Sequence, residues 1–216
     1  MFDDVTVIGA GRAGSAIAAR LRERGVRTRE NGALRLLCVP DRAIAEVARS
    51  IEPGPWVAHV SGGTPLAALG PHERRFSVHP LQTFTLARGP EQLDGAWGAV
   101  TAESEEALAR ARWLAETLGL QPFELADANR ASYHAGASIA SNFLVTLYRA
   151  ASHLFEEAGA PPRALVPLMT RTIENGFELT GPISRGDWET VERHREALRG
   201  SEFAAAYEAL AEVTRA

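Results

Sequence analysis

Strand and helix signals alternate along the first 125 residues of the chain and then stop. Helical spacing of apolar residues predicts helices over 13–24, 41–50 and 104–118. Short apolar or β-branched runs predict strands at 5–8, 26–30, 34–39, 56–60, 76–78, 96–101 and 122–125. This alternation is typical of an α/β fold with a doubly wound, mainly parallel sheet.

The remainder of the chain carries helical signals alone. Gly-Pro and Gly-Ser punctuation divides it into helices over 129–158, 162–180, 187–198 and 202–215. We therefore expect a Rossmann-like domain over 1–126 and an all-helical domain for substrate binding and dimerisation over 127–216. The small residues over 135–141 and the Ala-rich last helix need packing partners, which predicts a homodimer.

Composition excludes several classes of protein. The 216 residues, 45% of them hydrophobic, suffice for a buried core, which excludes a disordered chain. Acidic residues outnumber basic ones by 27 to 23 and no basic stripe occurs, so we expect no nucleic-acid partner. The longest apolar stretch, 135–145, is too short and too polar for a bilayer, so we expect a cytoplasmic protein without a membrane partner. The six histidines lack zinc-site spacing, and no metal site is expected.

A glycine-rich loop follows the first predicted strand and opens the first predicted helix. Its sequence is G-x-G-x-x-G, formed by Gly9, Ala10, Gly11, Arg12, Ala13 and Gly14. In this context, backbone N–H groups and the helix dipole hold a pyrophosphate, so the loop predicts dinucleotide binding. A tight turn that only packs helix on sheet is the competing interpretation.

The second predicted strand bears on the choice of cofactor. Arg27 and Arg29 favour NADP(H), because an arginine near this strand end can bind a 2′-phosphate. Glu30 is compatible with NAD(H), because an acidic residue there can bond the ribose 2′-OH. The stretch from Glu30 to Leu34 is too short for the usual second helix and third strand. Its Asn-Gly pair at 31–32 predicts a hairpin between two extended runs.

The shortened adenine side supports an alternative from another class. A ligand-sensing or non-catalytic Rossmann protein would keep the fold after its cofactor site had degenerated. A segment 27–32 that closed over the glycine loop would favour this alternative.

Further motifs follow the predicted strands, where doubly wound folds bind their ligands. Val39 and Pro40 are expected beside the phosphate and ribose on the nicotinamide side of the cofactor. Ser61 and Gly62 offer a hydroxyl and backbone N–H donors to a carboxylate or an oxyanion. His79 follows the next strand and is a candidate for substrate binding.

The sharpest chemical pattern is the row His134, Ser138 and Asn142, at i, i+4 and i+8 on the first helix of the helical half. A histidine can give a proton to a carbonyl or imine that is being reduced, and Asn142 would orient the same oxygen or nitrogen. The chain contains no lysine to act as the acid. A polar seam between helices is the competing interpretation.

Several segments resemble, in order along the chain, the Rossmann-like family with the C-terminal domain of unknown function 2520. They are the glycine loop, VPDRAI at 39–44, SG at 61–62, HPLQTF at 79–84, YH at 133–134 with ASN at 140–142, and TGPISRGD at 180–187. The resemblance implies a branch of the 6-phosphogluconate dehydrogenase-like reductases, beside pyrroline-5-carboxylate reductase, ketopantoate reductase and deazaflavin-dependent NADP reductase. In the ketopantoate and β-hydroxyacid enzymes a Lys and an Asn stand where this chain has His134 and Asn142.

These observations together predict an NADP(H)-linked reductase of a small 2-oxo acid or cyclic imine, working in the cleft between two domains. His134 and Asn142 are the expected catalytic residues. The second domain is expected to contribute Asn175, Thr180 and Gly181 to substrate binding.

Overall fold

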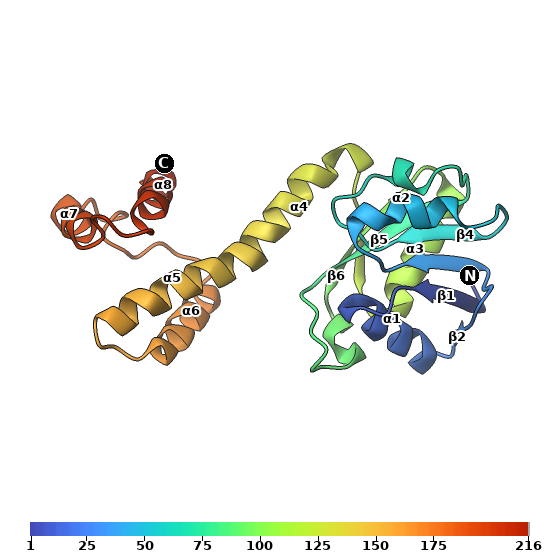
Figure 1. The fold of residues 1–216 in the computed structure, drawn as a ribbon, viewed down its shortest axis with the longest axis horizontal. Coiled ribbons are helices and arrows are strands. Elements are labelled where there is room, and N and C mark those ends of the chain that lie inside the picture. Colours follow the sequence, from blue (N-terminus) through green and yellow to red (C-terminus); the bar gives the residue numbers. More distant parts are fainter. Residues whose placement is uncertain (216) are drawn as a thin grey trace. The chain divides into compact units, whose positions relative to one another are not determined.

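The computed structural model describes residues 1–215, which form two compact units, Met1–Ser141 and residues 142 onward (Figure 1). The first unit contains a seven-stranded sheet and the helices that cover it. The strands are β1 (Asp4–Ile8), β2 (Arg27–Thr28), β3 (Leu34–Leu37), β4 (Trp56–His59), β5 (Arg75–Leu81), β6 (Trp97–Ala102) and β7 (Gln121–Glu124).

The sheet is mainly parallel, as predicted. Its strand order is β2-β1-β3-β4-β5-β6-β7, and only the β5–β6 pair is antiparallel. The carboxyl ends of β1, β3, β4 and β5 therefore share one edge. The glycine loop, Val39-Pro40 and the loop that begins at Ser61 all start at this edge.

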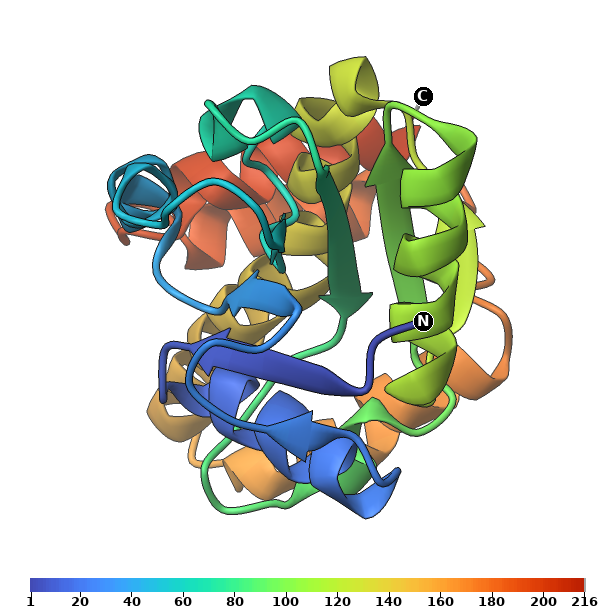
Figure 2. The same ribbon diagram turned by 90° about the vertical axis from the view of Figure 1, so that its right-hand side faces the viewer.

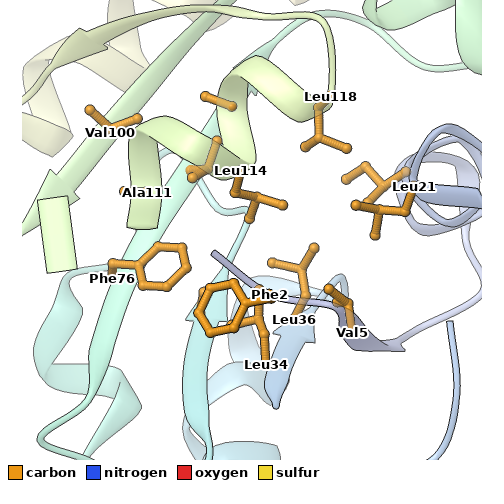
Figure 3. Packing of buried hydrophobic residues seen from close by; sticks show 14 of the residues in the cluster. Phe2, Val5, Leu21, Leu34, Leu36, Phe76, Val100, Ala111, Leu114 and Leu118 are labelled. Carbon is orange, nitrogen blue, oxygen red and sulfur yellow. The ribbon is translucent and has the colours of Figure 1, made fainter. Parts of the chain in front are cut away.

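Two apolar layers hold the helices against the sheet. Helices α1 (Arg12–Glu23) and α3 (Glu105–Thr117) cover one face, where Leu21 and Leu114 meet side chains of β1, β3 and β5 (Figure 3). Figure 2 shows α3 lying along β6. Helix α2 (Asp41–Arg49) and the short 3₁₀ helix η1 (Leu66–Leu69) cover the other face through Ile44, Leu66 and Leu69. Ser104 caps α3 by accepting from the N–H of Ala107 at 3.2 Å.

The predicted hairpin at Asn31-Gly32 is wrong. Strands β2 and β3 lie on opposite sides of β1 and both run parallel to it, so the five residues between them cross β1. Asn31 does adopt the left-handed conformation expected of a turn, with φ 56°. The crossing segment packs directly on the backbone of β1, because a Cβ at Gly32 would be 2.8 Å from the carbonyl carbon of Val5. Both strands pair with β1, and the local Asn-Gly signal carries no information on this pairing.

The helical half differs from the predicted helices at two places. The predicted single helix over 129–158 is three segments: α4 (Arg130–Ser138), a π-helical stretch (Ile139–Phe143) and α5 (Leu144–Glu157). The Ser141 hydroxyl donates to the Ala137 carbonyl at 2.7 Å, a contact that bends helices.

The predicted helix over 162–180 is shorter than expected. A 3₁₀ turn (Pro162–Ala164) leads into α6 (Leu165–Glu174), which ends where Gly176 and Phe177 take positive φ values of 68° and 63°. The last two helices, α7 (Trp188–Ala197) and α8 (Ala204–Arg215), lie where helices were predicted. Within residues 1–215, no helix has both the length and the apolar character needed to cross a membrane.

Candidate functional site

A buried arginine at the start of α4 anchors the site. Arg130 is 2% exposed and donates to Asp127 at 2.8 Å, to the Ser61 carbonyl at 3.0 Å, to the Gly62 carbonyl at 3.4 Å and to the Ser77 hydroxyl. Asp127 in turn accepts from the N–H of Leu66 at 3.0 Å. A guanidinium can hold several acceptors in a fixed fork, so Arg130 joins the loop after β4, strand β5 and helix α4 in one polar cluster.

The loop after β4 closes on its own hydroxyl. The Ser61 Oγ accepts from the N–H groups of Gly63 at 3.2 Å and Thr64 at 2.9 Å, and it bonds the Thr64 hydroxyl at 2.9 Å. The Ser61 N–H donates to Nδ1 of the buried His59 at 3.2 Å. The Ser61 side chain therefore shapes the loop, and its hydroxyl is engaged within the loop itself.

Two histidines meet over this loop. A Cβ added at Gly62 would lie 2.8 Å from Cε1 of His79 and 2.9 Å from Cδ2 of His134, and one at Gly63 would lie 3.0 Å from Nδ1 of His134. The two imidazole rings pack edge to face, with centroids 6.1 Å apart. Glycine at both positions is what allows the rings this close to the backbone.

Tyr133 completes the cluster. Its hydroxyl lies 2.7 Å from Nδ1 of His79, and its ring packs edge to face on His79 and on Phe123. Because Arg130, Tyr133 and His134 lie within one turn or so of α4, the arginine anchor also positions the tyrosine and the histidine.

Burial sets the charge of this cluster. It lowers the pKa of His79 to about 4, with His134 and Arg130 adding to the shift. It lowers the pKa of His59 to about 3, again helped by Arg130, and it raises the pKa of Tyr133 to about 12. At neutral pH both His59 and His79 are uncharged, so neither carries an imidazolium proton to give away.

The glycine loop after β1 has a different character. A Cβ at Gly9, where φ is 114°, would lie 2.4 Å from the Cys38 carbonyl oxygen, and one at Gly14 would lie 2.0 Å from the Gly9 carbonyl oxygen. A Cβ at Gly11 meets nothing within 4 Å. Gly11 is the N-cap residue of α1, and because glycine has no side chain, no cap bonds the N–H groups of the first turn. Two glycines thus serve close packing, and the third leaves open space at the start of a helix, as a pyrophosphate requires.

The two arginines expected at the adenine side contact the start of β1. Arg29 lies 2.5 Å and Arg27 3.6 Å from the buried Asp4 carboxylate, which also accepts from the N–H of Ala33 at 2.6 Å. Both side chains stay more than half exposed. The crossing from β2 to β3 bonds Asp4 and Thr6, in the first half of β1, rather than the glycine loop that begins at Gly9.

The family model for the domain of unknown function 2520 matches residues 96–214, more than half of the chain. The chain belongs to the DUF2520 family. Among curated proteins, none matches the chain.

Solved structures similar to this DUF2520 protein span its whole length. A Bacteroides fragilis protein described as a "putative NADP oxidoreductase" is 22% identical, with a TM-score of 0.83 and coverage of 98% of this chain and 97% of that one. A Thermotoga maritima protein, TM1727, is 23% identical, with a TM-score of 0.78 and coverage of 98% and 96%.

A third similar structure, 1-pyrroline-5-carboxylate reductase from Streptococcus pyogenes, is 15% identical, with a TM-score of 0.63 and coverage of 98% and 96%. At these identities the likeness establishes the fold. The DUF2520 protein shares with these structures a Rossmann-like, mainly parallel sheet followed by a helical region.

The structure brings some of the predicted site residues together. Ser61, Gly62, His79 and His134 form one cluster, and Ser138 follows His134 by one turn of α4, half-buried. Val39 packs on Gly9, with its Cγ1 3.3 Å from where a Cβ there would lie. Four predicted residues belong to the second unit, which is described by itself: Asn142, Asn175, Thr180 and Gly181.

Sequence reasoning missed Arg130, Asp127 and the role of Tyr133. The signal for the first two was their i, i+3 spacing at the start of a helix, which more often marks a solvent-exposed ion pair. His59, which the sequence does not mark as a candidate site residue, is fully buried, and its Nδ1 accepts from the Ser61 N–H of the loop after β4.

Proposed function

We propose that this DUF2520 protein is an NAD(P)H-dependent reductase that prefers NADP(H) and acts on a small 2-oxo acid or cyclic imine. The observation that carries the proposal is the placement, at one edge of the sheet, of a glycine loop open at Gly11 and a histidine pair over Gly62. A reduction of this kind needs both a dinucleotide site and a proton donor, and ligands of doubly wound folds bind at this edge.

The residues of the first loop fit a dinucleotide. Backbone N–H groups of Arg12 and Ala13, at the uncapped start of α1, would hold the pyrophosphate beside Gly11. Val39 and Pro40, at the end of β3, would lie along the nicotinamide half, and Arg27 and Arg29 would supply the positive charge for a 2′-phosphate. When bound, the cofactor supplies the hydride.

The histidine cluster would supply the proton. Reduction of a C=O or C=N bond adds hydride to carbon and a proton to oxygen or nitrogen. His134, whose ring lies over Gly62 and Gly63, is the proposed general acid. For the second unit by itself, we propose Asn142 as a residue that orients a substrate and Asn175, Thr180 and Gly181 as residues that bind one.

Cofactor binding tests the proposal first. Bound NADPH or NADH should accept energy from the protein's tryptophans and so quench their fluorescence. We expect NADPH to bind more tightly than NADH. Consumption of NADPH is then measured with ketopantoate, pyrroline-5-carboxylate and other 2-oxo acids. Absence of binding by both cofactors would instead favour the ligand-sensing alternative.

The second unit favours pairing with a second copy of the chain. It exposes many large apolar side chains, among them Val166 (52%), Leu168 (61%), Ile173 (54%), Phe177 (70%) and Leu179 (62%). Isolated exposed apolar residues are ordinary, but a group of this size marks an interaction surface. We expect a homodimer in light scattering at micromolar concentration, and a monomer there would contradict the proposal.

A further inference from the structure

We propose that Tyr133 fixes His79 in the tautomer that carries its proton on Nε2, and that this neutral N–H is a hydrogen-bond donor for a carboxylate oxygen of the substrate. The proposal rests on the proposed function and adds to it a residue that positions a substrate-binding histidine. It separates two tasks within the pair, with His79 binding the substrate and His134 supplying the proton.

The contact between Tyr133 and His79 determines the tautomer. The phenol O–H, 2.7 Å from Nδ1, has no other hydrogen-bond partner among residues 1–215. If Nδ1 carried the proton, it would have to donate to the phenol oxygen, which is a weaker hydrogen-bond acceptor than an imidazole nitrogen. The favourable arrangement has the phenol donating to Nδ1, and a neutral imidazole then carries its proton on Nε2.

Nε2 is placed to meet a ligand. It lies 2.9 Å from the position that a Cβ would take at Gly62, so the glycine keeps a side chain from covering it. Within the described part of the chain it has no hydrogen-bond partner, and it is absent from the fully enclosed unpaired polar atoms, which include Nε2 of His59. It therefore offers a free donor beside the loop.

The surrounding charges favour an anionic acceptor. The groups whose charges act on the pKa of His79 are His134, Arg130 and Asp41, and the two with the larger effect, His134 and Arg130, are basic. Arg130 is satisfied by its own partners and holds the loop rather than the ligand. A carboxylate is common to 2-oxo acids and to cyclic imine acids, so one donor at this position would serve both classes of substrate.

Nitrogen-15 NMR of the full-length labelled chain tests the tautomer directly. Long-range ¹H–¹⁵N spectra distinguish Nδ1–H from Nε2–H, and His79→Gln identifies the His79 signals among the six histidines. We expect His79 to be Nε2–H in the wild type. In Tyr133→Phe the ratio of Nδ1–H to Nε2–H should rise about two- to twelvefold, the change that the loss of one net hydrogen bond produces. The pKa of His79 should rise as well, because the donor that stabilised its neutral form is gone.

Two further comparisons make the test specific. His59 and His72 bond backbone groups, and their signals should be the same in Tyr133→Phe and in the wild type. Oxamate should shift the His79 Nε2 signal, whereas oxamide, which replaces the carboxylate by an amide, should not.

Each part of the proposal can fail by itself. An Nδ1–H tautomer in the wild type, or a Tyr133→Phe spectrum identical to it, would overturn the positioning role of Tyr133. An oxamate titration without effect on His79 would overturn the carboxylate assignment. If the tautomer depends on Tyr133 but neither NADPH nor NADH binds, the reductase proposal falls while the assignment of Tyr133 stands.

Discussion

Two glycine loops begin at the same edge of the sheet, one after β1 and one after β4, and they use their glycines in opposite ways. In the first, Gly9 and Gly14 pack against backbone while a side chain at Gly11 would enter open space. In the second, Gly62 and Gly63 are covered by the rings of His79 and His134. The first loop is built to admit something from outside, and the second is built to receive the protein's own side chains.

The difference shows where chemistry enters this fold. The first loop presents only backbone groups, which bind phosphate but transfer no proton. The second loop is completed by α4, some 70 residues later in the chain, which brings Arg130, Tyr133 and His134. The proposed reductase needs both, a backbone site for its cofactor and a side-chain site for its substrate.

The first loop allows the largest predicted effect and its own control. Gly14→Ala places a Cβ against the Gly9 carbonyl and should lower the free energy of unfolding by about 3 kcal/mol or more. Gly11→Ala should change it by no more than about 0.5 kcal/mol and yet weaken NADPH binding at least about tenfold. Urea unfolding and cofactor fluorescence measure the two quantities. Equal loss of stability in both variants would remove the distinction between packing and open glycines.

At the second loop, replacing the histidine of α4 that covers it should affect turnover alone. Once a substrate is found, His134→Ala should lower kcat by about 10² to 10⁴-fold, the usual contribution of a general acid, with NADPH binding nearly unchanged. His153→Ala, an exposed histidine paired with Glu157, is the matched control and should keep full activity. Full turnover by His134→Ala would end its assignment as the acid.

The two loops also differ in how much the sequence reveals. The first could be predicted because its pattern, its strand and its helix are contiguous, so local spacing carries the information. For the second, the sequence identified Gly62, His79 and His134 as separate candidates, but the contacts that join them are tertiary. Arg130 at a helix start has the local signature of a surface residue, and only its 2% exposure reveals the anchor.

The same limit explains the elements that were predicted wrongly. Asn31-Gly32 is a good turn, but whether the next strand returns beside its predecessor or crosses β1 depends on which edge of β1 is open. The sequence has a helical apolar pattern on both sides of the π turn over Ile139–Phe143, so the periodicity of apolar residues predicts a single helix there. Element types follow from local sequence, and their connections depend on the rest of the sheet.

The arginine anchor predicts an intermediate loss of stability. Arg130→Met leaves the Ser61 and Gly62 carbonyls and the Ser77 hydroxyl without their donor, and should lower the free energy of unfolding by about 2 to 4 kcal/mol. Arg171→Met removes an exposed arginine that pairs with Glu174 and should cost less than about 1 kcal/mol. Urea denaturation of both variants measures the difference, and similar midpoints would show that the second loop holds without its anchor.

The smallest predicted effect concerns the adenine side of the first loop, where Arg27 and Arg29 both pair with Asp4. Replacing both by Gln should reduce the preference for NADPH over NADH by about 2- to 30-fold, because each exposed charge contact contributes only about 0.2 to 1 kcal/mol. Arg22→Gln with Arg24→Gln, two exposed arginines at the end of α1, changes the net charge equally and should leave the preference unaltered. Because the two paired arginines remain more than half exposed, their charge is available to a phosphate as well as to Asp4. Equal affinity of the unaltered protein for both cofactors would show that their charge is used entirely to neutralise Asp4 and to secure the crossing over β1.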